Sequence, residues 1–74
     1  MAGRLRRLTA KEVEDLLTRH GFEFVSQRGS HRKWWKRSNS VQVVVPIHSG
    51  KPLPIGTLRH ILSQSGIPDR EWRE

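Results

Sequence analysis

The chain has 74 residues and no cysteine, and its 14 Lys and Arg against 7 Asp and Glu give a formal net charge of +7. A chain of this length predicts one domain that buries only about 60% of the surface its unfolded form exposes. The composition excludes disulfides and thiolate metal sites, and no apolar run reaches the roughly 18 residues of a membrane span. The arginine-rich start lacks the apolar stretch of a signal peptide, so we expect a cytoplasmic protein with no membrane partner.

Residues 1–8 are predicted to form a basic, flexible arm ahead of a single domain over residues 9–74. The arm carries Arg4, Arg6 and Arg7 and has too little apolar content to fold alone. The positive charge of the whole chain favours a polyanionic partner: nucleic acid, an anionic membrane surface or an acidic protein. Nucleic acid is preferred because basic side chains surround aromatic ones between Arg28 and Arg37, although a solubilising excess of charge is the alternative.

A first helix is predicted over about residues 10–20. Thr9-Ala10-Lys11-Glu12 has the pattern of a capping box, in which the threonine and glutamate side chains each satisfy a backbone N–H at the helix start. Apolar residues then recur at the spacing of one buried stripe, and Gly21 suits the position after the helix, where φ is positive. The stripe consists of Val13, Leu16 and Leu17.

Three strands are predicted next, and they form an antiparallel meander. The first covers Phe22 to Gln27, a turn at Arg28-Gly29-Ser30 leads into the second from His31 to Arg37, and Val41 to Val45 is the third, ended by Pro46. The period of two in the second strand places alternate residues on opposite faces, so one tryptophan can be buried and the other exposed. One face carries His31, Lys33 and Trp35, and the other carries Arg32, Trp34 and Lys36.

Residues 47–53 are predicted to be a loop, and a second helix follows over about residues 54–65. Pro54 suits its first turn, Gly66 suits its end, and Gly56 is expected to allow a close approach to the sheet. The buried stripe of this helix is Leu58, Ile61 and Leu62. A further helical turn is predicted near Trp72. The element order α-β-β-β-α predicts an α+β fold with two helices on one face of a three-stranded antiparallel sheet and His31 on the open face.

Four ordered motifs follow this pattern of elements. They are Gly29-Ser30-His31-Arg32, Val43-Val44-Val45-Pro46, His48-Ser49-Gly50-Lys51, and Leu53 to Leu58 followed by Ile61-Leu62 and Gly66-Ile67. Over about Thr9 to Ile67 the chain therefore resembles the HicA family of mRNA interferase toxins. The resemblance implies a fold similar to a double-stranded-RNA-binding domain, degradation of mRNA and inhibition by a HicB-type antitoxin. The family's catalytic residue is the histidine of its Gly-Ser-His motif, and that position is His31 here.

The chemistry of RNA agrees with a single histidine as the reactive group. A histidine side chain can accept the 2′-hydroxyl proton as that oxygen attacks phosphorus, or can protonate the leaving 5′-oxygen, while positive side chains stabilise the developing charge. The sequence has no clustered carboxylates, which suggests a reaction that uses no metal and no cofactor. Histidines 20, 31, 48 and 60 have no ligand-like spacing, which argues against a zinc site.

The other candidate contacts to RNA lie around His31 and in the following loop. Trp35 is suited to stack on an unpaired base or to pack in the core, and His48 to assist the reaction or to be a solvated loop residue. Arg37 and Arg59 are further candidate phosphate contacts. The candidate RNA-binding residues are Arg28, Gly29, Ser30, Arg32, Lys33, Trp35, Lys36, His48 and Lys51.

Two alternatives to an endoribonuclease remain open. The first is a non-catalytic RNA-binding module that uses the same basic face, which replacement of His31 would not weaken. The second is a regulatory protein that mainly binds another protein, for which a steep salt dependence of RNA affinity would be unexpected.

Overall fold

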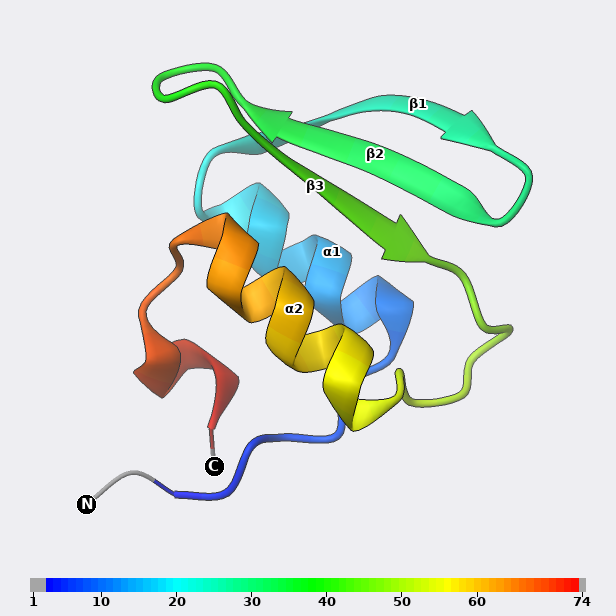
Figure 1. Cartoon of the computed structure of the whole chain (residues 1–74), viewed down its shortest axis with the longest axis vertical. Helices are drawn as coiled ribbons and strands as arrows, with labels where there is room; N and C mark the ends of the chain where they lie inside the picture. The colour runs from blue at the N-terminus through cyan, green and yellow to red at the C-terminus, as the bar shows by residue number, and fades with distance from the viewer. Residues whose placement is uncertain (1–2, 74) are drawn as a thin grey trace.

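The computed structural model describes residues 3–73 and has the predicted α+β fold (Figure 1). Both helices lie on one side of a three-stranded antiparallel sheet, and the order α-β-β-β-α is confirmed. Within residues 3–73, no helix is both long enough and apolar enough to cross a membrane. The elements are α1 (Ala10–Arg19), β1 (Phe22–Arg28), β2 (His31–Lys36), β3 (Val41–Pro46), α2 (Ile55–Ser65) and a short 3-10 helix, η1 (Asp69–Trp72).

The predicted capping box starts α1. The backbone N–H of Glu12 donates to the Thr9 hydroxyl over 3.2 Å, and the backbone N–H of Thr9 donates to the Glu12 carboxylate over 2.9 Å. The helix ends at Arg19, His20 is its C-cap residue, and Gly21 follows with φ of +90°, a conformation that glycine adopts at little cost. Both ends of α1 therefore lie within one residue of the range predicted from the sequence.

The sheet has the strand order β1-β2-β3 and contains one β-bulge. Phe24 is paired with Trp34, but the next pair is Ser26 with Lys33, so Val25 is an extra residue in β1. A bulge shifts the alternation of side chains by one position. As a result, the residues of β1 after Val25, from Ser26 to Arg28, face the side of the sheet opposite to the one that a regular strand would give them.

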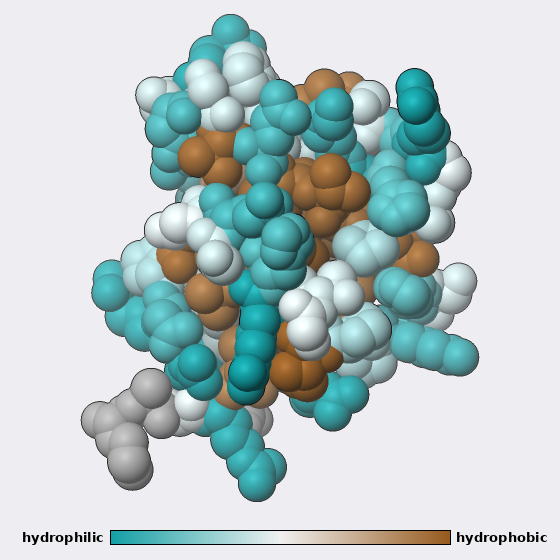
Figure 2. Space-filling view, in the orientation of Figure 1, coloured by the Kyte–Doolittle hydropathy of each residue, from teal (hydrophilic) through white to brown (hydrophobic). Residues whose placement is uncertain are grey.

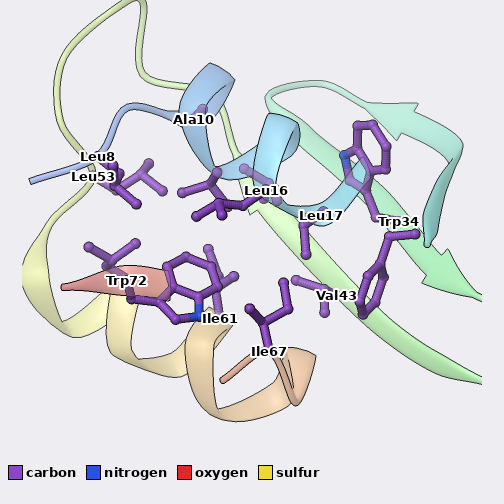
Figure 3. Close-up of a cluster of buried hydrophobic side chains, with 14 residues drawn as sticks. Leu8, Ala10, Leu16, Leu17, Trp34, Val43, Leu53, Ile61, Ile67 and Trp72 are labelled. Atoms are coloured by element: carbon purple, nitrogen blue, oxygen red, sulfur yellow. The ribbon is translucent and has the colours of Figure 1, made fainter. Parts of the chain in front are cut away.

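The hydrophobic core lies between the helices and the sheet (Figure 3). Trp34 is buried on the helix-covered face, whereas Trp35 is only half-buried on the opposite face, as the alternation of β2 predicts. Trp72 is fully buried and lies near Ile61, which connects the end of the chain to α2. The fully buried side chains also include Val13, Leu17, Val43, Val45, Leu53 and Leu58.

The described part of the predicted arm, residues 3–8, packs against the domain. Leu8 is buried in the core, Leu5 packs against it, and the backbone N–H of Leu53 donates to the Leu8 carbonyl over 2.8 Å. The backbone N–H of Arg6 likewise donates to the Trp72 carbonyl over 2.8 Å. This differs from the expected separate arm because two leucines are enough to anchor a short segment when backbone partners are also available.

Two details of α2 differ from the prediction. Pro54 precedes the helix, which begins at Ile55, so the proline is the cap residue. Gly56 is exposed, and a Cβ atom added there would meet nothing within 4 Å. The expectation that Gly56 permits a close approach to the sheet is therefore wrong: this helix packs through its Leu58 and Ile61 side.

Candidate functional site

The turn between β1 and β2 presents His31. Gly29 and Ser30 form a two-residue connection, and Gly29 has φ of +58°, as expected for the first central position of a tight hairpin turn. The Gln27 side-chain amide donates to the Gly29 carbonyl over 2.9 Å, and the backbone N–H of Ile47 donates to the Ser30 carbonyl over 2.7 Å. The turn is thus held from both sides, so His31 projects from a fixed backbone.

His31 lies with two other basic residues on the open face of the sheet. It is paired with Arg28 across the hairpin, and Lys33 follows it by two positions, which places all three side chains on one face. The three line a shallow depression together with Ser26 and Val44. All three are exposed to solvent. The structure therefore brings together an imidazole and two other basic side chains where a polyanion can reach them.

Arg32 lies on the opposite, helix-covered face, where it is engaged by Glu14 of α1. The Arg32 Nε donates to Glu14 Oε2 over 2.6 Å, and the Trp34 indole N–H donates to the same oxygen over 2.7 Å. Only 12% of the Glu14 side chain and 28% of the Arg32 side chain are exposed, so the pair is shielded from water. A second bond joins Arg32 Nη1 to the Gln27 Oε1 over 2.8 Å. Arg32 is thereby connected to the turn that carries His31 and is not beside His31 itself.

Trp35 and Lys36 are also separated by the alternation of β2. Trp35 shares the open face with His31, and the Arg37 guanidinium lies 5.8 Å from the centre of its ring, as in a cation–π contact. The Lys36 amine faces the other side, 6.0 Å from the centre of the Phe22 ring. Trp35 is thus available for stacking, and Lys36 lies away from the depression.

His48 and Lys51 belong to the loop that follows β3. The backbone N–H of Lys51 donates to the His48 carbonyl over 2.8 Å, closing a turn in which Ser49 and Gly50 both have positive φ. Both His48 and Lys51 are exposed. His48 lines a second depression with Lys11, Glu14 and Arg32, on the helix side of the hairpin. The structure therefore does not place His48 in the depression that His31 lines.

The network around Glu14 is the part of the site that the sequence interpretation did not include. The sequence did contain a clue to this network, because a tryptophan on the buried face of a strand needs a hydrogen-bond acceptor for its indole N–H. Glu14 directly follows Val13 of the buried stripe, which puts its carboxylate at the border of the core. Ser26 was missed for another reason, since the bulge at Val25 changes the face on which it lies.

Metal ligands are not gathered anywhere in the described chain. Over residues 3–73, no group of three or more His, Cys, Asp or Glu side chains is arranged to hold a metal ion. The basic side chains that line the depression are His31, Arg28 and Lys33.

One family of known proteins matches most of the chain. The model of the family described as the HicA toxin of bacterial toxin–antitoxin systems matches residues 10–67. This range holds α1, the whole sheet and α2, and it includes His31 and its depression. A comparison with curated proteins found no match. The match agrees with the resemblance carried by the motifs of the sequence.

Proposed function

Because this chain belongs to the HicA family of toxins from bacterial toxin–antitoxin systems, we propose that it is an endoribonuclease that cleaves mRNA in the cytoplasm with His31 as its catalytic residue. The observation that supports the proposal most directly is the grouping of His31, Arg28 and Lys33 around one exposed depression. An imidazole handles protons near neutral pH, and neighbouring cations attract and orient phosphates. One exposed face of the sheet thus offers the groups that the proposed reaction would use, one imidazole and two basic side chains.

The reaction needs two proton transfers, and RNA itself supplies the nucleophile. The 2′-oxygen bonds to phosphorus while the bond from phosphorus to the 5′-oxygen breaks, which leaves a 2′,3′-cyclic phosphate on one product. His31 takes the 2′-hydroxyl proton or delivers a proton to the leaving 5′-oxygen, and water serves the other transfer. Arg28 and Lys33 stabilise the negative charge that builds on the phosphate oxygens. Only one imidazole is provided, so the rate should be modest, which suffices for a toxin.

Membership of the family also implies an antitoxin partner. We propose that this partner is a HicB-type protein that covers the open sheet face around His31. The basic residues of that face favour an antitoxin surface with acidic side chains, since complementary charge directs association. Bound in this way, the antitoxin would block the approach of RNA to the depression.

The test is cleavage of a long single-stranded RNA in the presence of excess chelator. We expect the wild-type protein to cut the RNA and His31→Ala to be slower by about 10²–10⁴-fold, the usual contribution of general acid–base catalysis. His60→Ala is the matched control, because His60 is an exposed histidine on α2 and is not part of the depression. Circular dichroism spectra of all three proteins establish that they are equally folded.

Three results would contradict the proposal. Equal cleavage by wild type and His31→Ala would exclude His31 as the catalytic residue, and loss of cleavage in chelator would show that the reaction needs a metal. Tight RNA binding without any cleavage would favour the non-catalytic binding module instead. Half-exposed Trp35, with Arg37 over its ring, is the feature that such a module would use to stack a base.

A further inference from the structure

A second basic surface lies on the side of the helices away from the sheet. The segment before α1 alternates between anchoring and solvent-facing residues: Leu5 and Leu8 pack against the core, while Arg4 and Arg7 are exposed. Backbone pairing holds the segment in place, since Leu5 is bridged to Arg73 and Leu8 is bonded to Leu53. The arginines therefore project from a fixed backbone, and less conformational entropy is lost when they bind a ligand.

These arginines line a groove between the segment and the start of α2, where Arg59 joins them. The complete lining is Arg4, Leu5, Arg6, Arg7, Leu8, Glu12, Ile55, Arg59 and Arg73. Within residues 3–73, Arg4, Arg7 and Arg59 form no ion pair. In the view of Figure 2, hydrophilic side chains project below the helices, on the side where the N-terminal segment runs in Figure 1.

The acidic side chains near the groove are already engaged. Glu12 accepts hydrogen bonds from both the backbone N–H and the hydroxyl of Thr9. Asp69 is paired with Arg73 at 2.5 Å, and Glu71 lies 3.6 Å from His20. Among the described residues, five arginines and one glutamate line the groove, so this lining carries a net positive charge.

We propose that this groove binds the phosphate backbone of the same RNA that His31 cleaves, so the inference rests on the proposed function. Guanidinium groups match phosphate geometry because they donate two parallel hydrogen bonds. The buried core of a protein–protein interface is usually apolar. The apolar lining does not provide such a core, since Leu8 is buried and Leu5 and Ile55 are partly buried.

The loop after β3 connects the groove to the His31 site. Its first residue, Ile47, is bonded to the Ser30 carbonyl in the turn beside His31. Its far end, Leu53, is bonded to the Leu8 carbonyl in the basic segment. Lys51 is exposed between these two anchors. A strand of RNA that follows this loop thus meets positive side chains from the depression of His31 to the groove.

The experiment measures RNA affinity against salt concentration in the His31→Ala background, where the RNA stays intact. The test variant adds Arg7→Gln and Arg59→Gln. The control adds Arg19→Gln and Arg70→Gln, which remove the same charge from exposed positions outside the groove. Each phosphate contact to single-stranded RNA contributes about 0.7 to the slope of log affinity against log salt. Loss of two contacts should make the slope less steep by about 1.4. If the affinities of parent and variant meet at about 1 M salt, this change equals about 25-fold weaker binding at about 0.1 M salt.

The control variant should keep the slope of its parent. Equal changes in the test and control variants would overturn the inference, because only overall charge would then matter. An unchanged slope in the test variant would also overturn the inference, and an acidic protein would then be the favoured ligand of the groove. Neither result would affect cleavage by the wild-type protein, so failure of the inference is distinguishable from failure of the proposed function. A parent that binds no RNA would overturn both.

Discussion

Replacing Glu14 by glutamine tests whether one carboxylate joins α1 to the hairpin that carries His31. Glu14 Oε2 accepts from Arg32 over 2.6 Å and from the Trp34 indole over 2.7 Å. Glutamine has nearly the same shape and keeps one carbonyl oxygen, so the substitution removes the charge and leaves little change in packing. Arg32 would then remain in a shielded position, with 28% of its side chain exposed and no anionic partner.

The expected cost in the free energy of unfolding is about 2 kcal/mol. Hydrogen bonds to charged groups contribute about 1.5–3 kcal/mol each, but glutamine retains part of each bond and Arg32 regains some water. For a domain of this size, about 2 kcal/mol lowers the melting temperature by about 8–16 °C. The exposed pair of Lys11 and Asp15 is the matched control on the same helix. Asp15→Asn should cost less than about 0.5 kcal/mol, because solvent screens exposed ion pairs.

Urea unfolding of a double-mutant cycle provides the measurement. The cycle combines Glu14→Gln with Arg32→Met. The double variant should lose about 1–3 kcal/mol less free energy of unfolding than the sum of the losses in the two single variants. The reason is that removing both partners leaves no unpaired charge behind. Costs that add to within about 0.5 kcal/mol would refute the reasoning, since they would mean that Glu14 and Arg32 act independently.

Two further predictions concern the tryptophans and glycines. Both Trp72→Phe and Trp34→Phe leave a cavity in the core, but only Trp34→Phe also loses a bond to a carboxylate, since the buried indole N–H of Trp72 has no partner within residues 3–73. Trp34→Phe should therefore cost about 1.5–3 kcal/mol more than Trp72→Phe. Thermal unfolding compares the two, and an equal loss would contradict this account. Gly29→Ala should destabilise by about 1 kcal/mol since φ is +58°, whereas Gly56→Ala should stabilise by about 0.5–1 kcal/mol in helical backbone with open space around it. Urea midpoints that move in the same direction for both alanine variants would show that φ is not the deciding factor.

Much of the fold follows from local sequence patterns. The capping box at Thr9, the glycines after each helix and the alternation of β2 are short-range signals, and each is confirmed. Such signals act within a few residues, so they do not depend on how the elements pack. The motifs around His31 indicated the HicA family, which the match over residues 10–67 confirms.

The composition of the site depended on contacts between distant residues. The bulge at Val25 places Ser26 on the face of His31, and no local signal in β1 marked that bulge. Glu14 and Arg32 are 18 residues apart, so their pairing follows from the packing of α1 on the sheet.

The sequence by itself determined the element order, the buried tryptophan of β2, the positive charge and the histidine that follows the hairpin turn. Only the tertiary structure decided which basic residues surround that histidine, and it turned Arg32 toward Glu14 and anchored the arginine-rich segment beside α2. The physical reason is one of range. Backbone preferences and side-chain alternation act between neighbours in the chain, whereas a site and a groove are assembled from side chains that only packing brings together.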